Sequence, residues 1–570
     1  MSENRAENTN SKVLDALVLG AGFGGVQMLH DLRERGMSAI ALEAGDDVGG
    51  AWYWNRYPGA RCDVESLVYC YSFSPIIDAE WHWSERYAAQ PEIRAYIGFV
   101  VDRLDLRKDI RFNSTLVKAQ YDEATNLWTF ETEHGATYQA RYFISAAGPI
   151  SAPIWPDIPN RDAYKGQLLH SAMWPRDVEP DFTGKRVGVI GTGSSGTQLI
   201  PLVARQAGEL FVFVRTSNLY MPALNRPLSQ EDRTRWDGLR DTVRSRMRSF
   251  EIVGSGDVFH EEELHELRKS PGTAFTPEQR RHILERRLAH GGANVARAFS
   301  DVLTNDDINE EVCEFIREQV AVVENPGTAE LLTPRGFPYG TKRITIGTDY
   351  YETYNRDNVV AIDAKNTPIE RFTEKGVVID GKEIELDAVI CATGFDAVTG
   401  ALTALDIRGE GGRSIKDVWA DNCDTYLGFG IADFPNLLMI GGPGSPSVLV
   451  NVLVANDFQV EWIGRLLETM RDNGLDRIAV DPKAQQRWAQ TVKDVIKGTV
   501  MAKAKSWYVG ANVPGKTQGI LAYAGGLAKY IGLCEDCAST GYAGFELSSS
   551  NGSVRAMAVQ EKDKIVAGTD

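Results

Sequence analysis

The sequence predicts an α/β fold with two Rossmann-like dinucleotide-binding domains, the second inserted in the first, together with a helical insertion. Two glycine fingerprints, GAGFGG at 20–25 and GTGSSG at 191–196, each stand between a short apolar run and a helical pattern. Apolar runs that end in glycine return at 385–395 and 434–446, so the chain goes back to the first domain after the second. A chain of 570 residues is also too long for one hydrophobic core.

Composition narrows the class of protein. Lys plus Arg number 61 against 78 Asp plus Glu, and the net charge of −17 argues against nucleic acid or an anionic membrane surface as a partner. The polar N-terminus and the lack of a long apolar run predict neither a signal peptide nor a membrane helix. Seven scattered cysteines indicate a cytoplasmic protein, and the lone pair Cys534 and Cys537 is too little for a metal site.

The first fingerprint has the full context of a dinucleotide site. The apolar run 15–19 predicts a buried strand, Gly20 permits the tight turn, Gly22 lets the backbone approach a pyrophosphate, and Gly25 allows close packing of helix on strand. Glu43 follows the next apolar run, 23 residues after Gly20, where an acid accepts hydrogen bonds from ribose hydroxyls. An acid at this position argues against a 2′-phosphate, so we expect FAD or NAD in this domain.

The segment 46–65 predicts a long ordered loop with a function. It is rich in Gly, Trp, Tyr and Arg and has no clean period. Gly49 and Gly50, followed by Trp52, suit a backbone that passes close to a flat ring system. Asp63 lies in the same segment near two arginines in sequence, where a plain salt bridge is the alternative to a functional role. After this loop we expect a helix at 90–105, short antiparallel strands over 111–142 and a buried strand that ends at Gly148.

The second fingerprint differs from the first at one informative position. Val187–Ile190 predicts the strand, and Gly191, Gly193 and Gly196 form the fingerprint. Arg215 stands 24 residues after Gly191, where the first domain has its acid. A guanidinium there can neutralise and bind a ribose 2′-phosphate, so this domain should prefer NADP over NAD.

Residues 222–330 change to charged, helical patterns, with caps predicted at Ser229 and Thr276. This insertion could shape a substrate entrance or cover one face of a sheet, and both interpretations stay open. Beyond it, Lys342 and Arg343 are adjacent cations on a glycine-rich segment, and neighbours on a strand would point to opposite sides.

We expect the following organisation: a disordered N-terminus at 1–13, the FAD-binding domain at 14–150 and 386–547, the NADP-binding domain at 151–221 and 331–385, the helical insertion at 222–330, and a flexible C-terminal tail at 548–570.

Between the fingerprints lies the stretch YKGQLLHSAMWP at 164–175, whose spacing follows neither a helix nor a strand period. Its marked residues are Tyr164, Gly166, His170, Trp174 and Pro175. A histidine flanked by aromatics is usually a packed residue between domains. Between two dinucleotide domains the same stretch is also a candidate coupling element.

The two fingerprints, this central stretch and GGAWYWNRYPGARCD at 49–63 together resemble the flavin-dependent type I Baeyer–Villiger monooxygenases, over about Leu14 to Phe545 and closest to their phenylacetone monooxygenase branch. That family usually begins the central motif with Phe where this chain has Tyr164. The resemblance implies an FAD site at Gly20, Gly22, Gly25, Glu43, Gly50, Trp52 and Asp63. It implies an NADPH site at Gly191, Gly193, Gly196, Arg215, Thr216, Lys342, Arg343 and Trp507.

The resemblance also implies the reaction. NADPH would reduce FAD, O₂ would be captured as a peroxyflavin, and attack on a ketone would give a tetrahedral adduct that rearranges to an ester or lactone, with sulfoxidation as a further activity. Arg343 matches the catalytic arginine and Asp63 its carboxylate partner, while the central motif would link and couple the domains. The implied substrate pocket contains Val64, Pro149, Ser447, Val448, Leu449 and Val452. Pro149 and Val452 depart from the branch, which commonly has Gln and Met there, so the substrate range stays open.

Three other classes of protein share part of this pattern. A flavin-dependent N- or S-oxygenase shares both fingerprints but would lack Arg343 and the His–Trp–Pro part of the central motif. A flavin disulfide reductase needs a close cysteine pair after the first fingerprint, and Cys62 and Cys70 are too far apart. A non-catalytic NADP-binding protein would not need both Arg343 and Asp63. The expected partners are therefore a ketone and O₂, in a monomer or weak homodimer.

Overall fold

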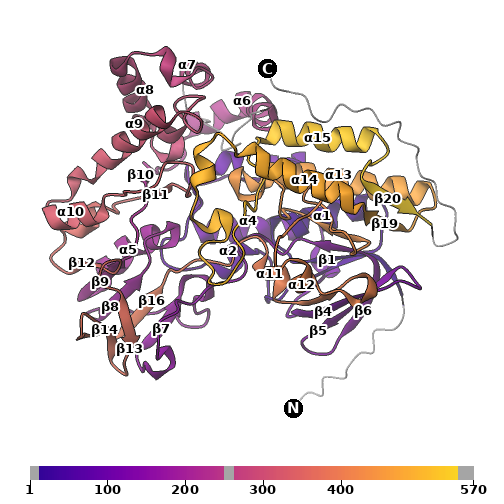
Figure 1. Cartoon of the computed structure of the whole chain (residues 1–570), viewed down its shortest axis with the longest axis horizontal. Helices are drawn as coiled ribbons and strands as arrows, with labels where there is room; N and C mark the ends of the chain where they lie inside the picture. Colours follow the sequence, from indigo (N-terminus) through magenta and orange to yellow (C-terminus); the bar gives the residue numbers. More distant parts are fainter. Residues whose placement is uncertain (1–11, 250–261, 550–570) are drawn as a thin grey trace.

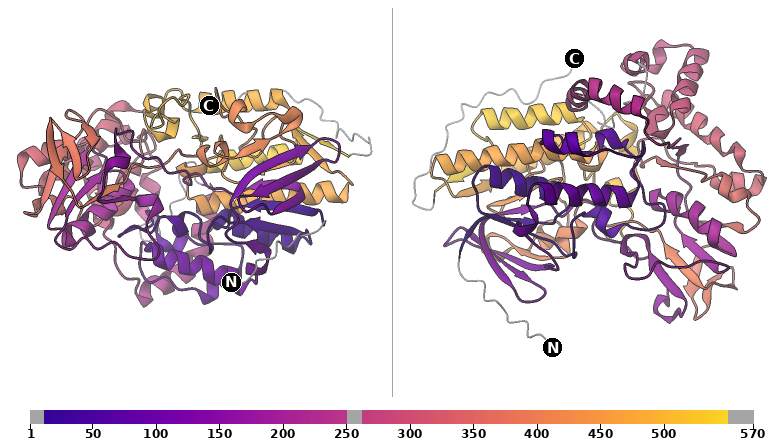
Figure 2. Two further views of the ribbon diagram at one scale, coloured as in Figure 1. Left: turned by 90° about the horizontal axis from the view of Figure 1, so that it is seen from below. Right: turned by 180° about the vertical axis from the view of Figure 1, so that it is seen from behind.

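Two open sheets, the first mixed and the second all-parallel, form the body of the molecule together with their helices, and a helical insertion extends beyond the second sheet (Figures 1 and 2). The computed structural model describes residues 12–249 and 262–549. The predicted terminal segments 1–13 and 548–570 lie almost wholly outside the described residues. Residue 548 was assigned to the tail but ends strand β20 (Phe545–Ser548), because its backbone pairs with β19 (Arg477–Val480).

The first sheet has eight strands in the order β17-β4-β5-β6-β1-β2-β3, with β18 also paired to β6. Its parallel part, β3-β2-β1-β6-β18, is the predicted Rossmann-like arrangement, and β4 to β6 form the predicted antiparallel strands. The strands are β1 (Leu14–Leu19), β2 (Ala39–Leu42), β3 (Ile110–Arg111), β4 (Leu116–Asp122), β5 (Leu127–Thr132), β6 (Thr137–Ser145), β17 (Asp406–Arg408) and β18 (Leu437–Met439).

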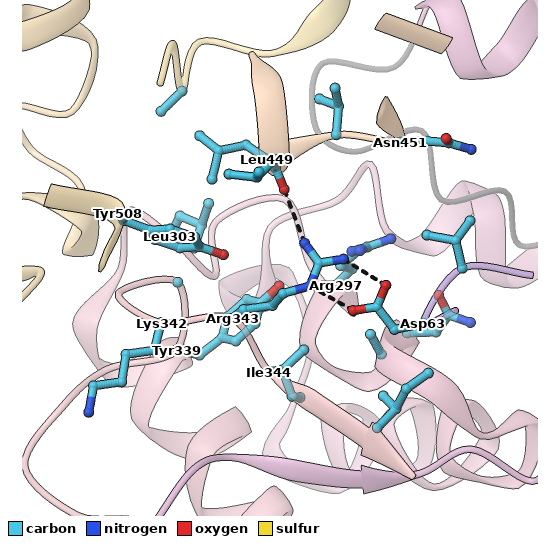
Figure 3. Close-up of a pocket in the computed structure, with 18 of the residues that line it drawn as sticks. Asp63, Arg297, Leu303, Tyr339, Lys342, Arg343, Ile344, Leu449, Asn451 and Tyr508 are labelled. Atoms are coloured by element: carbon cyan, nitrogen blue, oxygen red, sulfur yellow. Dashed lines mark hydrogen bonds and ion pairs between the residues drawn. The ribbon is translucent and has the colours of Figure 1, made fainter. Parts of the chain in front are cut away.

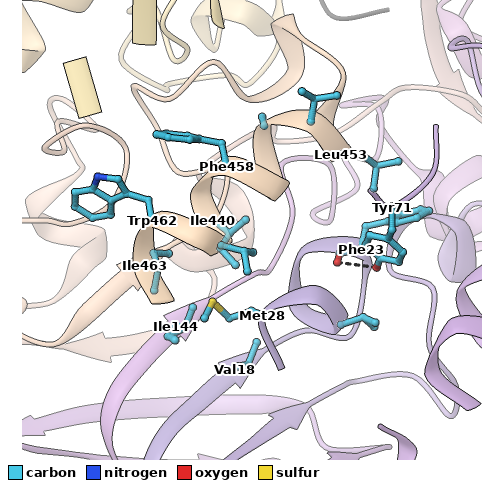
Figure 4. Close-up of a cluster of buried hydrophobic side chains, with 14 of the residues drawn as sticks. Val18, Phe23, Met28, Tyr71, Ile144, Ile440, Leu453, Phe458, Trp462 and Ile463 are labelled. Atoms are coloured by element: carbon cyan, nitrogen blue, oxygen red, sulfur yellow. Dashed lines mark hydrogen bonds between the residues drawn. The ribbon is translucent and has the colours of Figure 1, made fainter. Parts of the chain in front are cut away.

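Helices from both ends of the chain cover this sheet. They are α1 (Phe23–Glu34), α2 (Ala51–Trp54), α3 (Pro75–Glu80), α4 (Gln90–Arg103), α11 (Gly400–Thr403), α12 (Ile415–Val418), α13 (Val452–Asp472), α14 (Pro482–Val495) and α15 (Leu527–Ser539). Helix α1 lies between the sheet and α13, so residues from the first fifth of the chain and from its last quarter share one core. Figure 4 shows Val18 and Ile144 of the sheet, Met28 of α1, and Leu453 and Trp462 of α13 in that core.

The second sheet has the all-parallel order β12-β9-β8-β16-β7. Its strands are β7 (Gln167–His170), β8 (Arg186–Ile190), β9 (Glu209–Val214), β12 (Val359–Asp363) and β16 (Ala388–Cys391), with α5 (Ser194–Gln206) behind β8 and a small sheet of β13 (Ile369–Phe372), β14 (Gly376–Ile379) and β15 (Lys382–Glu385) beside it. The predicted boundary at residue 386 is wrong for β16. This strand pairs with β8 and β7, so the chain leaves the second sheet only after Cys391.

The helical insertion covers a small sheet, which is one of the two interpretations that the sequence left open. Its helices are α6 (Gln230–Ser249), α7 (Glu262–Leu267), α8 (Pro277–His290), α9 (Asp306–Arg317) and α10 (Pro326–Leu332). The predicted cap at Thr276 is a complete capping box with Gln279. Apolar residues of α8 and α9 pack on the two-stranded sheet of β10 (Tyr220–Pro222) and β11 (Thr345–Gly347). The turn between α8 and α9 also reaches the cavity described below.

Across the described residues, no helix combines the length and the apolarity needed to cross a membrane.

Candidate active site

The first glycine fingerprint is closed so tightly that it has no room for side chains. Gly20, directly after β1, has a φ of +98°. A Cβ on Gly25, in the first turns of α1, would lie 1.9 Å from the carbonyl oxygen of Gly20. The N-terminus of α1 therefore packs against the end of β1, and its free N–H groups face the edge of the sheet where a pyrophosphate can bind.

Glu43, directly after β2, is buried and held in a fixed orientation. Its Oε2 accepts a hydrogen bond from the N–H of Ala21 and its Oε1 from the N–H of Gly45, both at 2.8 Å. Burial raises the pKa of Glu43, while these backbone hydrogen bonds oppose the rise. Because a carboxylate can accept about four hydrogen bonds, each oxygen keeps capacity for a ribose hydroxyl.

The glycine pair at 49–50 brings a second backbone segment to the same place. Gly50 has a φ of +53°, and a Cβ on it would lie 2.8 Å from the Cα of Gly22. Trp52, in the short helix α2, donates its indole N–H to the hydroxyl of Tyr69 at 3.0 Å. The loop and the fingerprint thus meet backbone to backbone, which fits a nucleotide that carries a flat ring system.

The second fingerprint repeats this closure. A Cβ on Gly196, in α5, would lie 2.2 Å from the carbonyl oxygen of Gly191, whose φ is +113°. A Cβ on Gly193 would meet no atom of the described chain within 4 Å, so the backbone there is open to a ligand. The residues at both fingerprints fit the bound dinucleotides that their spacing predicts.

Three cations gather beside the second fingerprint. Arg215 and Thr216 follow β9 and are exposed. Burial lowers the pKa of Lys342, and the positive charges of Arg215 and Lys365 lower it further. The Lys342 ammonium also lies 4.2 Å from the centre of the Phe337 ring. The predicted pair Arg215 and Lys342 is therefore brought together, and Lys365 is a third cation that sequence analysis missed.

Arg343 and Asp63 meet at a cavity of about 130 Å³ (Figure 3). The Arg343 guanidinium donates a hydrogen bond to each carboxylate oxygen of Asp63, from Nε to Oδ2 at 2.6 Å and from Nη2 to Oδ1 at 2.8 Å. Its Nη1 donates to the carbonyl oxygen of Val448 at 3.1 Å. Val448 belongs to the 3-10 helix η10 (Ser447–Leu449), where Ser447 adopts a left-handed φ of +43°. That strained residue sets the direction of the next carbonyl group.

The ion pair fixes the charge of both groups. The attraction of Asp63 raises the pKa of Arg343. Burial alone would raise the pKa of Asp63, but the charge and hydrogen bonds of Arg343 outweigh it and leave that pKa below its usual value of 3.8. Arg343 is therefore a permanent cation and Asp63 a permanent anion at neutral pH. An arginine has five N–H donors, so about two remain for a ligand in the cavity.

Some predicted pocket residues line this cavity and others do not. Val64, Val448 and Leu449 are among its lining residues. Ser447 is buried beneath it and Val452 begins α13, while the Pro149 carbonyl accepts from the N–H of Val398 at 2.7 Å. Ser447, Val452 and Pro149 are thus not among the described residues that line the cavity.

Two neighbouring aromatic residues near the C-terminus lie differently relative to the cavity. Trp507 begins the 3-10 helix η12 (Trp507–Val509), but its neighbour Tyr508 lines the cavity. Their ring centres are 4.5 Å apart. Burial raises the pKa of Tyr508 to about 12, so its hydroxyl remains protonated. Sequence analysis had no signal for Tyr508 at the cavity, and the NADP contact of Trp507 stays a prediction.

The central motif is buried outside the cavity. Tyr164 donates to the carbonyl oxygen of Leu386 at 2.8 Å, and a Cβ on Gly166 would lie 2.2 Å from the Tyr164 hydroxyl. His170, 1% exposed at the end of β7, accepts the N–H of Ala172 on Nδ1 at 3.1 Å. Trp174 is buried in the core of the second sheet, with Pro175 half-buried beside it.

Arg176, the residue after this motif, contacts helix α2 in the segment 46–65. The Arg176 guanidinium lies 4.2 Å from the ring centre of Tyr53 and 4.6 Å from that of Trp54, both in α2. It also donates to the Tyr53 hydroxyl. The structure thus joins the central motif to the segment that contains Trp52, which favours a linking role over direct chemistry.

Arg297 and Leu303 are among the cavity residues that had no sequence signal. Both come from the turn between α8 and α9 in the helical insertion. Neither stands at a motif position, and only the folding of the insertion onto β10 and β11 brings them to the cavity.

Comparison with known proteins gives consistent matches. The family model "flavin-binding monooxygenase-like" matches residues 13–227. Acetone monooxygenase (methyl acetate-forming) from Gordonia sp. strain TY-5 is 38% identical, over 95% of this chain and all of the relative. A Baeyer–Villiger monooxygenase from Pseudooceanicola batsensis is 37% identical, over 94% and 97%. Phenazine N-monooxygenase from Lysobacter antibioticus is 37% identical, over 95% and 98%.

Solved structures match over a similar range. Oxidized steroid monooxygenase bound to NADP has 42% sequence identity and a TM-score of 0.88, over 94% of this chain and all of that one. The OTEMO complex with FAD and NADP has 38% identity and a TM-score of 0.89, over 95% of this chain and all of that one.

Proposed function

This chain belongs to the flavin-dependent Baeyer–Villiger monooxygenases, and on that premise we propose that it uses FAD, NADPH and O₂ to convert ketones to esters or lactones. The observation that supports the reaction most directly is the Arg343–Asp63 pair at the cavity. This pair holds a permanent cation in a partly enclosed site, and the two glycine fingerprints on the two sheets fit one dinucleotide each.

We assign the first fingerprint, with Glu43, Gly50 and Trp52, to FAD. The second, with Arg215, Thr216, Lys342 and Trp507, is assigned to NADP. The domain division is then the predicted one, with β16 moved to the NADP-binding domain. FAD, when bound and reduced by NADPH, supplies the activated oxygen. The protein supplies binding, orientation and charge.

In the proposed reaction, Arg343 stabilises negative charge that develops on the ketone oxygen. Asp63 and the Val448 carbonyl use three of its N–H donors, so the guanidinium cannot rotate away while the others remain for substrate. A fixed donor of this kind requires no reorganisation when charge appears. Asp63 is a positioning residue, because its carboxylate holds the Arg343 guanidinium in place.

The test is Arg343→Ala, compared with Arg343→Lys. We expect NADPH to reduce the flavin of Arg343→Ala, whereas ester formation falls by about 10²-fold or more, as when a transition-state donor is removed. Arg281→Ala is the control, because Arg281 pairs with glutamates on the insertion and lies outside the cavity. Ester formation at near wild-type rates in Arg343→Ala would contradict the proposed mechanism.

A second candidate function is N- or S-oxygenation, which the similarity to a phenazine N-monooxygenase favours. A panel of aryl, linear and cyclic ketones, thioethers and tertiary amines separates the two. Conversion of ketones to esters or lactones supports the first function, with sulfoxide formation as the predicted side activity. Oxygen insertion into amines or thioethers alone would support the second.

We also propose that the enzyme is cytoplasmic and a monomer or weak homodimer. All seven cysteines lie in the described residues and all are free thiols, which suits a reducing compartment. The assignment to the phenylacetone monooxygenase branch stays a prediction.

A further inference from the structure

The cavity contains a second arginine that the proposed reaction does not use. Arg297 ends the 3-10 helix η6 (Gly292–Arg297), between α8 and α9, and lines the cavity together with Asp63 and Arg343 (Figure 3). It comes from the helical insertion, whereas Asp63 comes from the loop after α2.

Arg297 forms no hydrogen bond and no ion pair with the described residues. Its Nε is buried without a hydrogen-bond partner, and within residues 12–249 and 262–549 its guanidinium forms neither a hydrogen bond nor an ion pair. The charge of Arg297 helps to lower the pKa of Asp63, so the two groups lie near each other. Arg343 already occupies both Asp63 oxygens, however, and Asp63 is not free to pair with a second guanidinium.

Arg297 differs from the other charged residues that line the cavity in having neither an oppositely charged partner among the described residues nor a place at the proposed 2′-phosphate site. Its charged lining residues are Asp63, Glu65, Arg297, Lys342 and Arg343. Asp63 pairs with Arg343. Glu65 accepts from the Nη2 of Arg86 at 2.6 Å. Lys342 faces Arg215 at the proposed 2′-phosphate site. One cation is left without an anion, and a partly buried guanidinium without a partner costs free energy unless a ligand supplies one.

The turn that precedes Arg297 is closely packed. Gly291 and Gly292 both have left-handed φ values, of +67° and +74°. A Cβ on Gly291 would lie 2.6 Å from the carbonyl oxygen of Ala223, and a Cβ on Gly292 would lie 2.2 Å from the Tyr87 hydroxyl. The turn therefore packs closely against its neighbours, and it begins the 3-10 helix that carries Arg297 at the cavity.

We propose that Arg297 binds a carboxylate on the substrate, so that this enzyme prefers ketones that bear a carboxylate at a distance from the reacting carbonyl. A guanidinium matches a carboxylate with two parallel hydrogen bonds, and the pairing would satisfy the buried Nε. In this arrangement Arg343 faces the ketone oxygen and Arg297 the carboxylate. The inference rests on the proposed ketone oxidation and adds the substrate class.

The experiment compares a keto acid with its primary amide, which has nearly the same shape and no charge. Wild-type holoenzyme and the variants Arg297→Gln, Arg297→Lys and Arg281→Gln are assayed for kcat/KM with both substrates and for the KM of NADPH. We expect wild type and Arg281→Gln to favour the acid by about tenfold to a hundredfold, which is the range for hydrogen bonds to a charged group. Arg297→Gln should lose this preference while it oxidises the amide as before, and Arg297→Lys should keep part of it.

Binding is measured separately by calorimetry of the keto acid with oxidised holoenzyme, in which no turnover occurs without NADPH. We expect its dissociation constant to rise by a similar factor in Arg297→Gln. If the ratio of acid to amide is the same in wild type and Arg297→Gln, the inference is wrong although ketone oxidation stands. A higher KM for NADPH with an unchanged ratio would overturn it too and assign Arg297 to the nucleotide. If no ketone of either charge is oxidised, the proposed function fails, while loss of keto acid binding in Arg297→Gln would still support the anion site.

Discussion

Arg215 and Lys342 are like charges that lie near each other in the folded protein. Lys342 has a lowered pKa partly because Arg215 and Lys365 lie near it. Within the described chain Arg215 forms no ion pair with an acidic side chain. Such a cluster is unfavourable by itself and becomes favourable when a phosphate binds.

We therefore expect Arg215→Ala to raise the KM for NADPH by about tenfold to a hundredfold and to change the KM for NADH little, since only NADPH has a 2′-phosphate. Steady-state kinetics with both nucleotides tests this. Arg205→Ala is a matched control, because Arg205 is exposed on α5 and pairs with Asp349 instead. Equal losses for both nucleotides would refute the role of Arg215 at the 2′-phosphate.

At the residue scale, sequence predicts what local geometry determines. Arg215 was found because a strand, a turn and a helix place it at a fixed offset from Gly191. The pairing of Arg343 with Asp63, 280 residues away, came from resemblance alone, since spacing cannot predict a contact of that range. Arg297 had neither signal, because it ends a six-residue turn in an insertion with no motif.

At the scale of elements, the two glycine fingerprints have the same shape. The same Gly→Ala substitution in each of them can therefore show which nucleotide each one binds. An added methyl group would meet a carbonyl oxygen at 1.9 Å in Gly25→Ala and at 2.2 Å in Gly196→Ala. The helix must shift away from its strand in each case, at a cost of about 1–3 kcal/mol.

We expect Gly25→Ala to lose bound flavin, whereas Gly196→Ala should retain flavin and bind NADPH more weakly. Flavin absorbance per protein and NADPH titration measure these effects. Gly98→Ala is the control, because Gly98 lies in α4 with no atom of the described chain within 4 Å of its Cβ, and this change should stabilise the protein by about 0.5–1 kcal/mol. Flavin loss in Gly196→Ala with retention in Gly25→Ala would reverse the assignment of the two domains.

The central motif is an element whose sequence spacing now has a physical reason. The Tyr164 hydroxyl lies where a Cβ of Gly166 would be, so the aromatic and the glycine require each other. His170 is buried with both ring nitrogens engaged, to the Ala172 N–H and to the region of the Ile154 carbonyl and Thr393 hydroxyl. Burial lowers its pKa below 6.5.

This lowered pKa predicts acid sensitivity. Below pH 6.5 His170 is protonated in the unfolded chain but not in the folded chain. The free energy of unfolding therefore decreases as the pH is lowered, by at most about 1.4 kcal/mol per pH unit, until the folded pKa is reached. In His170→Asn the melting temperature should therefore change less between pH 7.5 and 5.5 than in wild type. His134→Asn, at an exposed turn, is the control. An unchanged pH dependence in His170→Asn would show that His170 is not buried in its neutral form.

For the whole molecule, the predicted alternation between two parallel sheets is correct, but one strand is assigned to the wrong sheet. The sequence predicts β16 in the first domain because its residues are all apolar and a glycine follows soon after, as for strands of both sheets. A strand that is buried on both faces gives no sequence signal for its partners. Only the pairing of Cys391 with Ile190 and His170 assigns it to the second sheet.

The two halves must also hold their bound nucleotides in a fixed relation, and Gln198 of α5 connects them. Its Oε1 accepts from the Tyr57 hydroxyl at 2.8 Å, and its Nε2 donates to the carbonyl oxygen of Arg61 at 2.9 Å. Tyr57 and Arg61 precede Asp63 in the loop after α2, so these contacts link the helix of the second fingerprint to the segment that carries Asp63.

Gln198→Ala should therefore slow flavin reduction by NADPH by about tenfold or more, because a displacement near 1 Å between reacting groups costs up to about 10²-fold in rate. Flavin content and the dissociation constant of NADPH should stay unchanged, since neither fingerprint is altered. Stopped-flow bleaching of the flavin measures the rate, and Gln206→Ala, exposed at the end of the same helix, is the matched control. If Gln198→Ala reduces its flavin as fast as Gln206→Ala does, the halves are held together by other contacts, and the Arg176 stack on Tyr53 and Trp54 becomes the connection to test.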